Sequence, residues 1–567
     1  MISPYARPRL MVVAVLMAGV GLVVLVQLFR LQIIDHSVLR QTGEARRTYP
    51  LAIRPERGRI WDRHGVLLAG NEPRYEMWLD RHSMDTGTLM LTLAPMVGLK
   101  PDDIRAALSG TQQAVMLATD LPVAVGERVI SETIAGLDVV PYWRRHYPER
   151  TLAAHVLGFY TAQHRGYYGL EGFYDQRLAG EVISRTQEQD AQRNPMPLDV
   201  TQDFTARAQR GVDLVLTIDR TAQMIVEHEL AVALEATGAE QGAIIAMDPR
   251  TGDILAMASA PGFDPNVYTD IAAHDPDRFV NVAISDLYEP GSVFKIITLA
   301  AALDTGQVSR DTTYFDTACL EVGGRQLCNW DRKDHGPVSM IDMMAKSLNV
   351  GAATLSTRMG AAEFYRYVTA FGFGKPTGID LQAEATGQLR LPDDLDWYES
   401  DLGTNAFGQG LSATPLQVIA AVAAVANAGE LVQPHVVKAI ADGEAVREAQ
   451  IVEMGRAIRP DTARTLTEVL VEAVAREVPQ ARVPGYRIAG KTGTSQIPIP
   501  GGYDDPWTIG SFVGYGPASD PQLVILVRLD RPTLSPWGAD TAAPVFQRVA
   551  ARLFAVLGIA PDDVMAE

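Results

Sequence analysis

Three short motifs in this chain hold the residue types of a serine nucleophile site. In chain order they are Ser292-Val293-Phe294-Lys295, Ser347-Leu348-Asn349 and Lys491-Thr492-Gly493-Thr494. A serine hydroxyl attacks well only when a nearby base takes its proton. Lys295 follows Ser292 by three residues, which places both side chains on one face of a helix. We therefore expect Lys295 to be that base, with its pKa lowered by burial or a neighbouring positive charge.

The second and third motifs supply the other groups that such a site needs. Ser347 offers a second hydroxyl and Asn349 a neutral hydrogen-bonding support. The hydroxyls and the lysine of the third motif, 491–494, suit a terminal carboxylate, and Lys491 could also lower the pKa of the base. Gly493 lets a substrate backbone approach a strand edge because no side chain intervenes. About one Ser-x-x-Lys is expected by chance in a chain of this length, so the signal lies in the ordered trio.

The sequence around the motifs predicts the elements that hold them. Pro290-Gly291 breaks a helix and 293–303 has helical potential, so Ser292 is expected at a helix start, where free N–H groups favour negative charge. Asp219 and Gly238 are a predicted helix cap and stop. The other predicted elements are strands at 212–218, 243–248, 253–258, 486–494, 511–515 and 523–529, and a helix at 416–426. Strands at both ends with helices between them indicate an α+β domain, a sheet packed on a helical cluster.

Composition limits what else the chain could be. It has 567 residues, enough for more than one core, with 21% charged and 47% hydrophobic residues, as in folded proteins. The formal net charge of −18 argues against nucleic acid as a partner, because a phosphate backbone needs a basic face.

The segment 10–29 is apolar except for Gln27 and matches the thickness of a bilayer as a helix. The alternative is a cleaved signal peptide, but no small-residue cleavage site follows, so an uncleaved anchor is expected. Arginines lie on both sides of the span, so the loop-charge rule gives no orientation.

The only two cysteines, Cys319 and Cys328, flank a Gly323-Gly324 pair that favours a two-residue hairpin turn. Counting outward from that turn places the cysteines opposite each other as a non-hydrogen-bonded pair, close enough for a disulfide. An oxidised pair would fit an extracytoplasmic compartment, and two free core thiols are the alternative.

The ordered motifs resemble those of the class B penicillin-binding proteins, which are membrane-anchored D,D-transpeptidases that cross-link peptidoglycan. Nearly the whole chain takes part in the resemblance. The further segments that carry it are Arg57-Gly-Arg-Ile-Trp-Asp-Arg-His-Gly, Trp143-Arg-Arg-His-Tyr-Pro, His155-Val-Leu-Gly-Phe, Gly169-Leu-Glu-Gly, Phe407-Gly-Gln-Gly, Thr414-Pro-Leu-Gln and Ser511-Phe-Val-Gly-Tyr. Glu289, in Glu-Pro-Gly-Ser, is more similar to division-type members than to elongation-type ones.

The resemblance implies a role for each motif residue and no metal or organic cofactor. Ser292 would be the nucleophile, Lys295 its base and Ser347 a proton relay, with Asn349 in support. The N–H groups of Ser292 and Thr494 would form the oxyanion hole. Lys491, Thr492 and Thr494 would bind the donor carboxylate.

The resemblance also implies a domain order and partners. We expect a cytoplasmic tail at 1–9, an anchor at 10–29, a pedestal or dimerisation-type domain at 30–211, an extracytoplasmic transpeptidase domain at 212–557 and a tail at 558–567. The expected partners are peptidoglycan stem peptides, β-lactam inhibitors, a SEDS-type glycosyltransferase and other wall-synthesis membrane proteins. A β-lactamase, a D,D-carboxypeptidase, a β-lactam sensor or a silent scaffold of the same fold are the alternatives.

Overall fold

The computed structural model describes residues 6–40, 48–53, 55–80, 87, 89–109, 114–132, 134, 136–181, 183–188 and 210–562. The chain forms two compact units, each assembled from separate stretches of sequence. The first comprises Met1–Glu56, Pro73–Arg144 and Ala179–Arg210, and the second comprises Arg57–Glu72, Arg145–Leu178 and Gly211–Glu567. Parts of the predicted tails at 1–9 and 558–567 lie outside the described residues.

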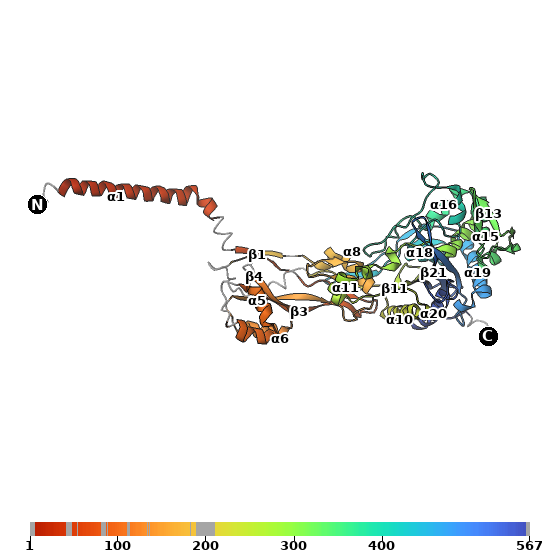
Figure 1. Ribbon diagram of the computed structural model, residues 1–567, viewed down its shortest axis with the longest axis horizontal. Helices are drawn as coiled ribbons and strands as arrows, with labels where there is room; N and C mark the ends of the chain where they lie inside the picture. The colour runs from red at the N-terminus through yellow and green to blue at the C-terminus, as the bar shows by residue number, and fades with distance from the viewer. Residues whose placement is uncertain are drawn as a thin grey trace. The chain divides into compact units, whose positions relative to one another are not determined.

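The first unit begins with one long apolar helix, α1 (Ala6–Phe29) (Figure 1). The stretch Pro8–Ile34 has a mean hydropathy of 2.7, and its length and composition are sufficient to cross a membrane. A small core lies elsewhere in the unit, formed by Met77, Leu79, Leu89, Leu93, Ile104, Leu121 and Val129. The elements here include β1 (Thr48–Ile53), which pairs with β8 (Ile183–Glu188), β4 (Ala114–Leu121), α5 (Pro101–Ser109) and α6 (Val123–Ser131).

A five-stranded antiparallel sheet is the centre of the second unit (Figure 1). Its strands lie in the order β11 (Ile254–Ala260), β10 (Gln241–Met247), β22 (Leu523–Asp530), β21 (Gly502–Gly516) and β20 (Ala489–Ile499). The strand that carries Lys491 is therefore an edge strand, with one side available to the rest of the site.

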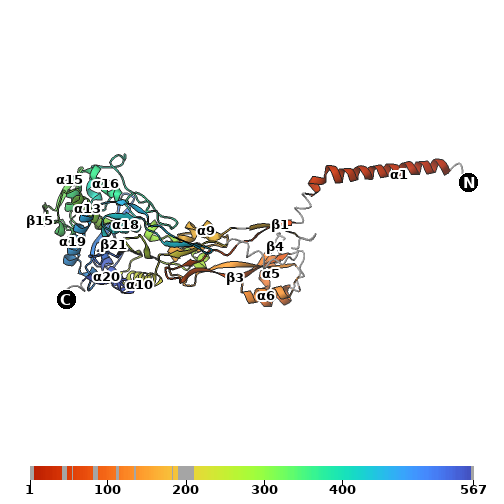
Figure 2. The same cartoon turned by 180° about the vertical axis from the view of Figure 1, so that it is seen from behind.

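Helices cover both faces of this sheet, because successive side chains of a strand point to opposite faces. Ile244 packs in the cluster that includes α10 (Arg220–Thr237) and α20 (Ala542–Leu557). Its neighbour Ile245 packs in the other cluster, with α13 (Lys295–Asp304) and α18 (Pro415–Ala426). The helices of that second layer are seen together in Figure 2, which also labels α15 (Asn349–Met359), α16 (Ala361–Ala370) and α19 (Pro460–Glu477).

Several local predictions are confirmed. The Asp219 side chain accepts from the N–H groups of Thr221 and Ala222 at the start of α10, and Gly238 ends that helix with φ of 66°. The predicted hairpin at 243–258 and the helix at 416–426 are present. The strand predicted at 486–494 begins later, at Ala489, and continues to Ile499. The α+β fold class is also confirmed.

A second sheet in this unit joins segments that are far apart in the sequence. The short strand β2 (Ile60–Trp61) pairs in parallel with β9 (Asp213–Leu216) and antiparallel with the start of β3 (Leu67–Asp80). On its other side, β9 pairs with β17 (Val437–Asp442). The residues from 57 to 72 are thus part of the fold of the second unit.

The cysteine hairpin has the register that the sequence predicted. In β13 (Cys319–Val322) and β14 (Arg325–Cys328), Cys319 lies opposite Cys328, and both turn glycines have positive φ. The two sulfur atoms are 2.07 Å apart, as a disulfide.

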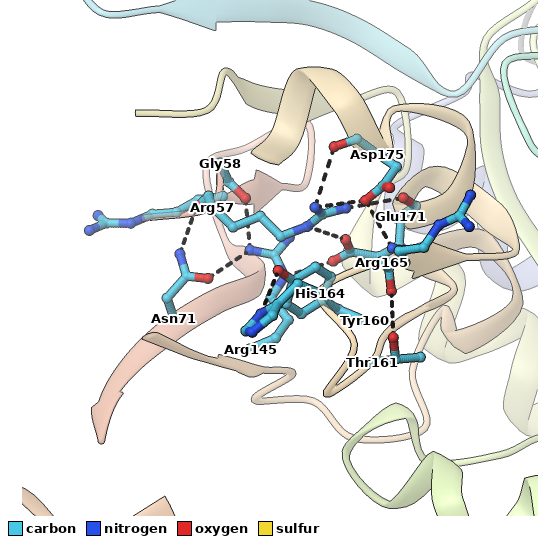
Figure 3. A network of polar contacts seen from close by, with 12 residues as sticks. Arg57, Gly58, Asn71, Arg145, Tyr160, Thr161, His164, Arg165, Glu171 and Asp175 are labelled. Carbon is cyan, nitrogen blue, oxygen red and sulfur yellow. Dashed lines mark hydrogen bonds and ion pairs between the residues drawn. The ribbon is translucent and has the colours of Figure 1, made fainter. Parts of the chain in front are cut away.

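Three of the family-like segments meet in one buried ionic network, shown in Figure 3. The fully buried carboxylate of Glu171 accepts from Arg57 Nε and from Arg145 Nε, both at 2.6 Å. The hydroxyl of Tyr147 donates to the same carboxylate at 3.2 Å, and Arg145 Nη1 donates to the Gly58 carbonyl at 2.7 Å. The network ties the stretches 57–72 and 145–178 to each other inside the second unit.

Candidate active site

Ser292 lies in a single 3₁₀ turn, Gly291–Phe294, that leads directly into α13. The sequence predicted a helix from Val293, so the regular helix begins two residues later than expected. The predicted proximity is present: Lys295 Nζ lies 3.0 Å from Ser292 Oγ. The turn and helix therefore bring an amine to a hydroxyl, as the three-residue spacing indicated.

Lys295 is fully buried and contacts Ser347 and Asn349 of the second motif. Its Nζ lies 2.6 Å from the Ser347 carbonyl oxygen, 2.8 Å from Asn349 Oδ1 and 3.1 Å from Ser347 Oγ. Burial, with a smaller contribution from the charge of Lys491, holds the pKa of Lys295 well below its usual range. A neutral amine has two hydrogens and one lone pair. The hydrogens match the two oxygens that can only accept, which leaves the single lone pair to accept from one serine hydroxyl at a time, Ser292 or Ser347.

The second motif sits in a short connection between α14 (Met340–Ala345) and α15. Ser347 has φ of 58°, a left-handed conformation that costs energy for a residue other than glycine. That conformation presents both its carbonyl and its hydroxyl to Lys295. Asn349 starts α15, and its Nδ2 donates to the Cys328 carbonyl at 3.1 Å.

The third motif lies on the edge strand β20, as predicted. Lys491 is almost completely buried, and its Nζ contacts the carbonyl oxygen and Oγ1 of Thr492, both at 3.2 Å. Burial lowers the pKa of Lys491 to about 7. Thr494 Oγ1 accepts from the N–H of Gly538 at 3.0 Å, which fixes this hydroxyl on the strand.

Gly493 is required by the protein's own packing. A Cβ at this position would lie 2.3 Å from Ser511 Oγ and 3.0 Å from Val293 Cγ2. The sequence suggested that this glycine leaves room for a substrate. The structure gives a further reason for it, because any side chain would separate β20 from β21 and from the turn of the nucleophile.

Some residues that surround the nucleophile were not assigned to the site in the sequence analysis. Gly408 has φ of 76°, and a Cβ there would lie 2.3 Å from the Gly291 carbonyl oxygen. The Gly291 N–H donates to the Gly408 carbonyl at 3.0 Å, so Gly408 supports the turn that carries Ser292. Glu289 is buried beside this turn and accepts from the N–H of Gly410 at 2.8 Å. In the sequence, Phe407-Gly-Gln-Gly indicated the family but not that Gly408 supports the turn of the nucleophile.

Two exposed tryptophans lie between the second and third motifs. The rings of Trp330 and Trp537 meet edge to face with centroids 5.4 Å apart. Trp330 Nε1 donates to the carbonyl of Lys346, the residue before Ser347. Trp537 precedes Gly538, which contacts Thr494. The ring pair therefore connects the two sides of the site.

Comparison with known families agrees with this geometry. A family model described as the penicillin binding protein transpeptidase domain matches residues 242–551, which is more than half of the chain. A second model, the penicillin-binding protein dimerisation domain, matches residues 52–216. The chain belongs to the class B penicillin-binding proteins. The resemblance read from the motifs is confirmed.

Relatives of this class B penicillin-binding protein extend over nearly all of its length. Stage V sporulation protein D of Bacillus subtilis is 34% identical, in a match that covers 98% of this chain and 86% of the relative. A protein of Mesostigma viride called peptidoglycan D,D-transpeptidase FtsI homolog is 26% identical, with 98% and 96% covered. The crystal structure of penicillin binding protein 3 of Mycobacterium tuberculosis with aztreonam has a TM-score of 0.70 at 28% identity, covering 90% of this chain and 98% of that one.

Proposed function

We propose that this penicillin-binding protein is a peptidoglycan D,D-transpeptidase that works through a serine acyl-enzyme. One observation carries the proposal: the buried Lys295 amine lies 3.0 Å from Ser292 Oγ and 3.1 Å from Ser347 Oγ. The match to the transpeptidase family model and the name of the Mesostigma viride relative, peptidoglycan D,D-transpeptidase FtsI homolog, support the same activity.

In the first half-reaction, Ser292 Oγ attacks the carbonyl of the penultimate D-alanine and passes its proton to the neutral Lys295. The N–H groups of Ser292 and Thr494 stabilise the oxygen of the tetrahedral intermediate. The proton then moves through Ser347 to the nitrogen of the terminal D-alanine, which leaves as the C–N bond breaks. During this half-reaction, Lys491, Thr492 and Thr494 hold the terminal carboxylate.

In the second half-reaction, an amine of a neighbouring stem peptide attacks the ester carbonyl of the acyl-enzyme. The amine loses a proton to Lys295, the new amide forms, and Ser292 Oγ regains a proton as it leaves. A β-lactam would enter the first half-reaction and remain on Ser292, because no amine reaches the acylated serine. Asn349 positions the lysine in both steps.

We also propose the setting in which this site works. The apolar helix α1 anchors the chain as a single span, with residues 1–9 in the cytoplasm and the catalytic domain, 212–557, outside. The region 30–211 is proposed to act as a pedestal that contacts a SEDS-type glycosyltransferase and other wall-synthesis membrane proteins. The Glu289-Pro-Gly-Ser sequence favours a division-type role.

Intact mass spectrometry of the chain after brief exposure to benzylpenicillin tests the proposal. We expect one adduct of unchanged drug mass that persists for hours, is located on Ser292 and is absent from Ser292→Ala. Rapid loss of the adduct with turnover of the drug would identify a β-lactamase instead. Incubation with a D-Ala-D-Ala peptide and an acceptor amine should then yield the cross-linked peptide, whereas release of the free acid alone would identify a carboxypeptidase.

A further inference from the structure

Three consecutive residues at the end of the cysteine hairpin, 328–330, hold the loop of the second motif. Each forms one hydrogen bond to that loop, and the pairs are the Cys328 carbonyl with Asn349 Nδ2 at 3.1 Å, Asn329 Oδ1 with the N–H of Val350 at 3.1 Å, and Trp330 Nε1 with the Lys346 carbonyl at 3.2 Å. Ser347 lies between the bonded positions. The segment 328–330 therefore fixes the chain on both sides of the hydroxyl that contacts Lys295.

The conformation of Ser347 follows from the way in which α14 ends. The N–H of Leu348 donates to the Met343 carbonyl at 3.0 Å, which is the bond that closes a Schellman motif. Ser347 therefore occupies the left-handed position that such a motif usually gives to glycine, with φ of 58°. This conformation is strained for serine, so contacts from outside the helix have to maintain it.

The contact that acts directly on the strained peptide comes from Trp330. The last carbonyls of a helix have no partner within the helix, and the carbonyl of Lys346, at the end of α14, accepts from the Trp330 indole. That carbonyl belongs to the planar peptide unit that precedes the Ser347 Cα, so a rotation of this unit changes φ of Ser347. The indole N–H can only donate. It therefore opposes the rotation that would release Ser347 from the left-handed region.

Trp537 supports Trp330 from the side of the third motif. The two rings meet edge to face with centroids 5.4 Å apart, a favourable arrangement for aromatic side chains. The next residue, Gly538, donates its N–H to Thr494 Oγ1 on β20. The ring of Trp330 is 59% exposed, so it contributes little to the core, and a substitution there should leave the fold intact. The ring pair thus holds the Trp330 N–H in place between the second and third motifs.

We infer that Trp330 is a positioning residue of the reaction, which holds Ser347 where its hydroxyl can pass a proton to the leaving nitrogen. The inference rests on the proposed function, in which Ser347 is the relay. When the C–N bond breaks, the nitrogen keeps the electron pair and takes the proton of Ser347 Oγ. Ser347 Oγ in turn takes a proton from the Lys295 ammonium, 3.1 Å away. The left-handed conformation keeps the hydroxyl turned toward that amine.

A leaving group that needs no proton separates this role from a general effect on the site. The probes are benzylpenicillin, in which a nitrogen leaves, and an N-acyl-D-alanyl thioglycolate, in which sulfur takes the electron pair and leaves as a thiolate. The full chain is used in lipid nanodiscs, with quenched mass spectrometry of the penicillin adduct and thiol release in the first thioester turnover. We expect Trp330→Phe, which keeps a ring but loses the N–H, to slow penicillin acylation about 10-fold, the factor for one hydrogen bond. The thioester rate should stay within about 2-fold, because a thiol, with a pKa of about 8.5, leaves without a proton.

Matched variants separate the inference from the proposed function. Trp78→Phe in the first unit removes an indole bond of the same length, 3.2 Å to Glu76, and should leave both rates unchanged. Ser347→Ala tests the relay itself and should slow the penicillin reaction more than the thioester reaction. If Ser347→Ala shows this difference but Trp330→Phe slows both probes equally or neither, the inference is wrong and the proposed function stands. If Ser347→Ala shows no difference between the probes, the proposed relay fails and the inference fails with it.

Discussion

Asn349 Nδ2 donates to the backbone carbonyl of Cys328 at 3.1 Å. The other end of the same amide, Oδ1, accepts from Lys295 Nζ at 2.8 Å. Because a carbonyl can only accept, it determines which end of the amide faces the lysine. The cysteine hairpin therefore fixes the orientation of a group that touches the proposed base.

The first prediction concerns this amide. Asn349→Asp places a negative charge beside Lys295, which should raise the pKa of the lysine and reduce the neutral fraction. We expect penicillin acylation at pH 7 to slow by about 10-fold or more, because one pKa unit changes the neutral fraction about 10-fold. The rate should recover as the pH is raised, and stopped-flow or quenched mass spectrometry can follow it. Asn427→Asp, at the end of α18, should behave as the wild type. If the acylation rate of Asn349→Asp were reduced by the same factor at all pH values, the electrostatic explanation would be refuted.

The second prediction is a bell-shaped pH profile of kcat/KM for a peptide donor. Lys295 must lose its proton to act as a base, so the rate rises with pH through the pKa of Lys295, which burial holds well below its usual range. Lys491 must keep its proton to hold the carboxylate, so the rate falls as the pH rises through the pKa of Lys491, about 7. In Lys491→Arg the side chain stays charged at high pH. The fall of kcat/KM on the alkaline side of the profile should therefore disappear, even if the maximal kcat/KM of the variant is lower. A profile that rises continuously to pH 9 would contradict the assignment.

The third prediction concerns the ionic network in Figure 3. Glu171→Gln leaves the buried Arg145 without a carboxylate and Arg57 with Asp175 alone, and it should cost about 3–5 kcal/mol in the free energy of unfolding. Burial alone would raise the pKa of Glu171, but Arg145 and Arg57 lower it. The carboxylate therefore stabilises the fold above its unfolded pKa of 4.5, and this stability is lost as the pH falls through the lower folded pKa.

Denaturant unfolding of the two proteins at several pH values checks this sign. The difference between wild type and Glu171→Gln should be full at pH 7 and shrink below about pH 4. Glu363→Gln, which removes one partner of an exposed pair with Arg366, is the control and should leave the unfolding midpoint unchanged. A small effect of Glu171→Gln at pH 7 would show that the network contributes little to the fold.

The fourth prediction concerns Cys319 and Cys328. Replacing both by serine should lower the free energy of unfolding by about 2–3 kcal/mol, as expected for a disulfide that closes a loop of about ten residues. Dithiothreitol should lower the thermal midpoint of the wild type and leave that of the double variant unchanged. Free thiols in protein isolated from its native membrane would show that the pair is not oxidised there.

Local features were the ones that the sequence could predict. The cap at Asp219 and the stop at Gly238 act within a few residues, and so does the turn at Gly323-Gly324, from which the cysteine register follows by counting. The three motifs indicated the family because their residue types and order are rare in combination. None of these predictions required knowledge of tertiary contacts.

Long-range relationships could not be predicted in the same way. No local pattern shows that Ile60 pairs with Leu214, since strand pairing over such a separation depends on the whole fold. Only a similarity to division-type proteins could be inferred for Glu289, because its bonds to Gly410 and Tyr503 join segments that are far apart in the sequence. The left-handed conformation of Ser347 could not be predicted from the sequence either, since only the surrounding contacts maintain it.

The pairing of β2 with β9 has a consequence for the synthesis of this protein. Ile60 leaves the ribosome 154 residues before its partner Leu214. At about 5–20 residues per second, Leu214 in β9 is synthesised about 8–30 s after Ile60. The nascent chain thus carries β2 with one edge unpaired, since its other edge can pair with β3, and Arg57 of the same segment without Glu171 until residue 171 is made. Slower elongation or chaperone binding during that interval should therefore change the yield of active protein. The same conditions applied while the C-terminal residues are synthesised should have a smaller effect.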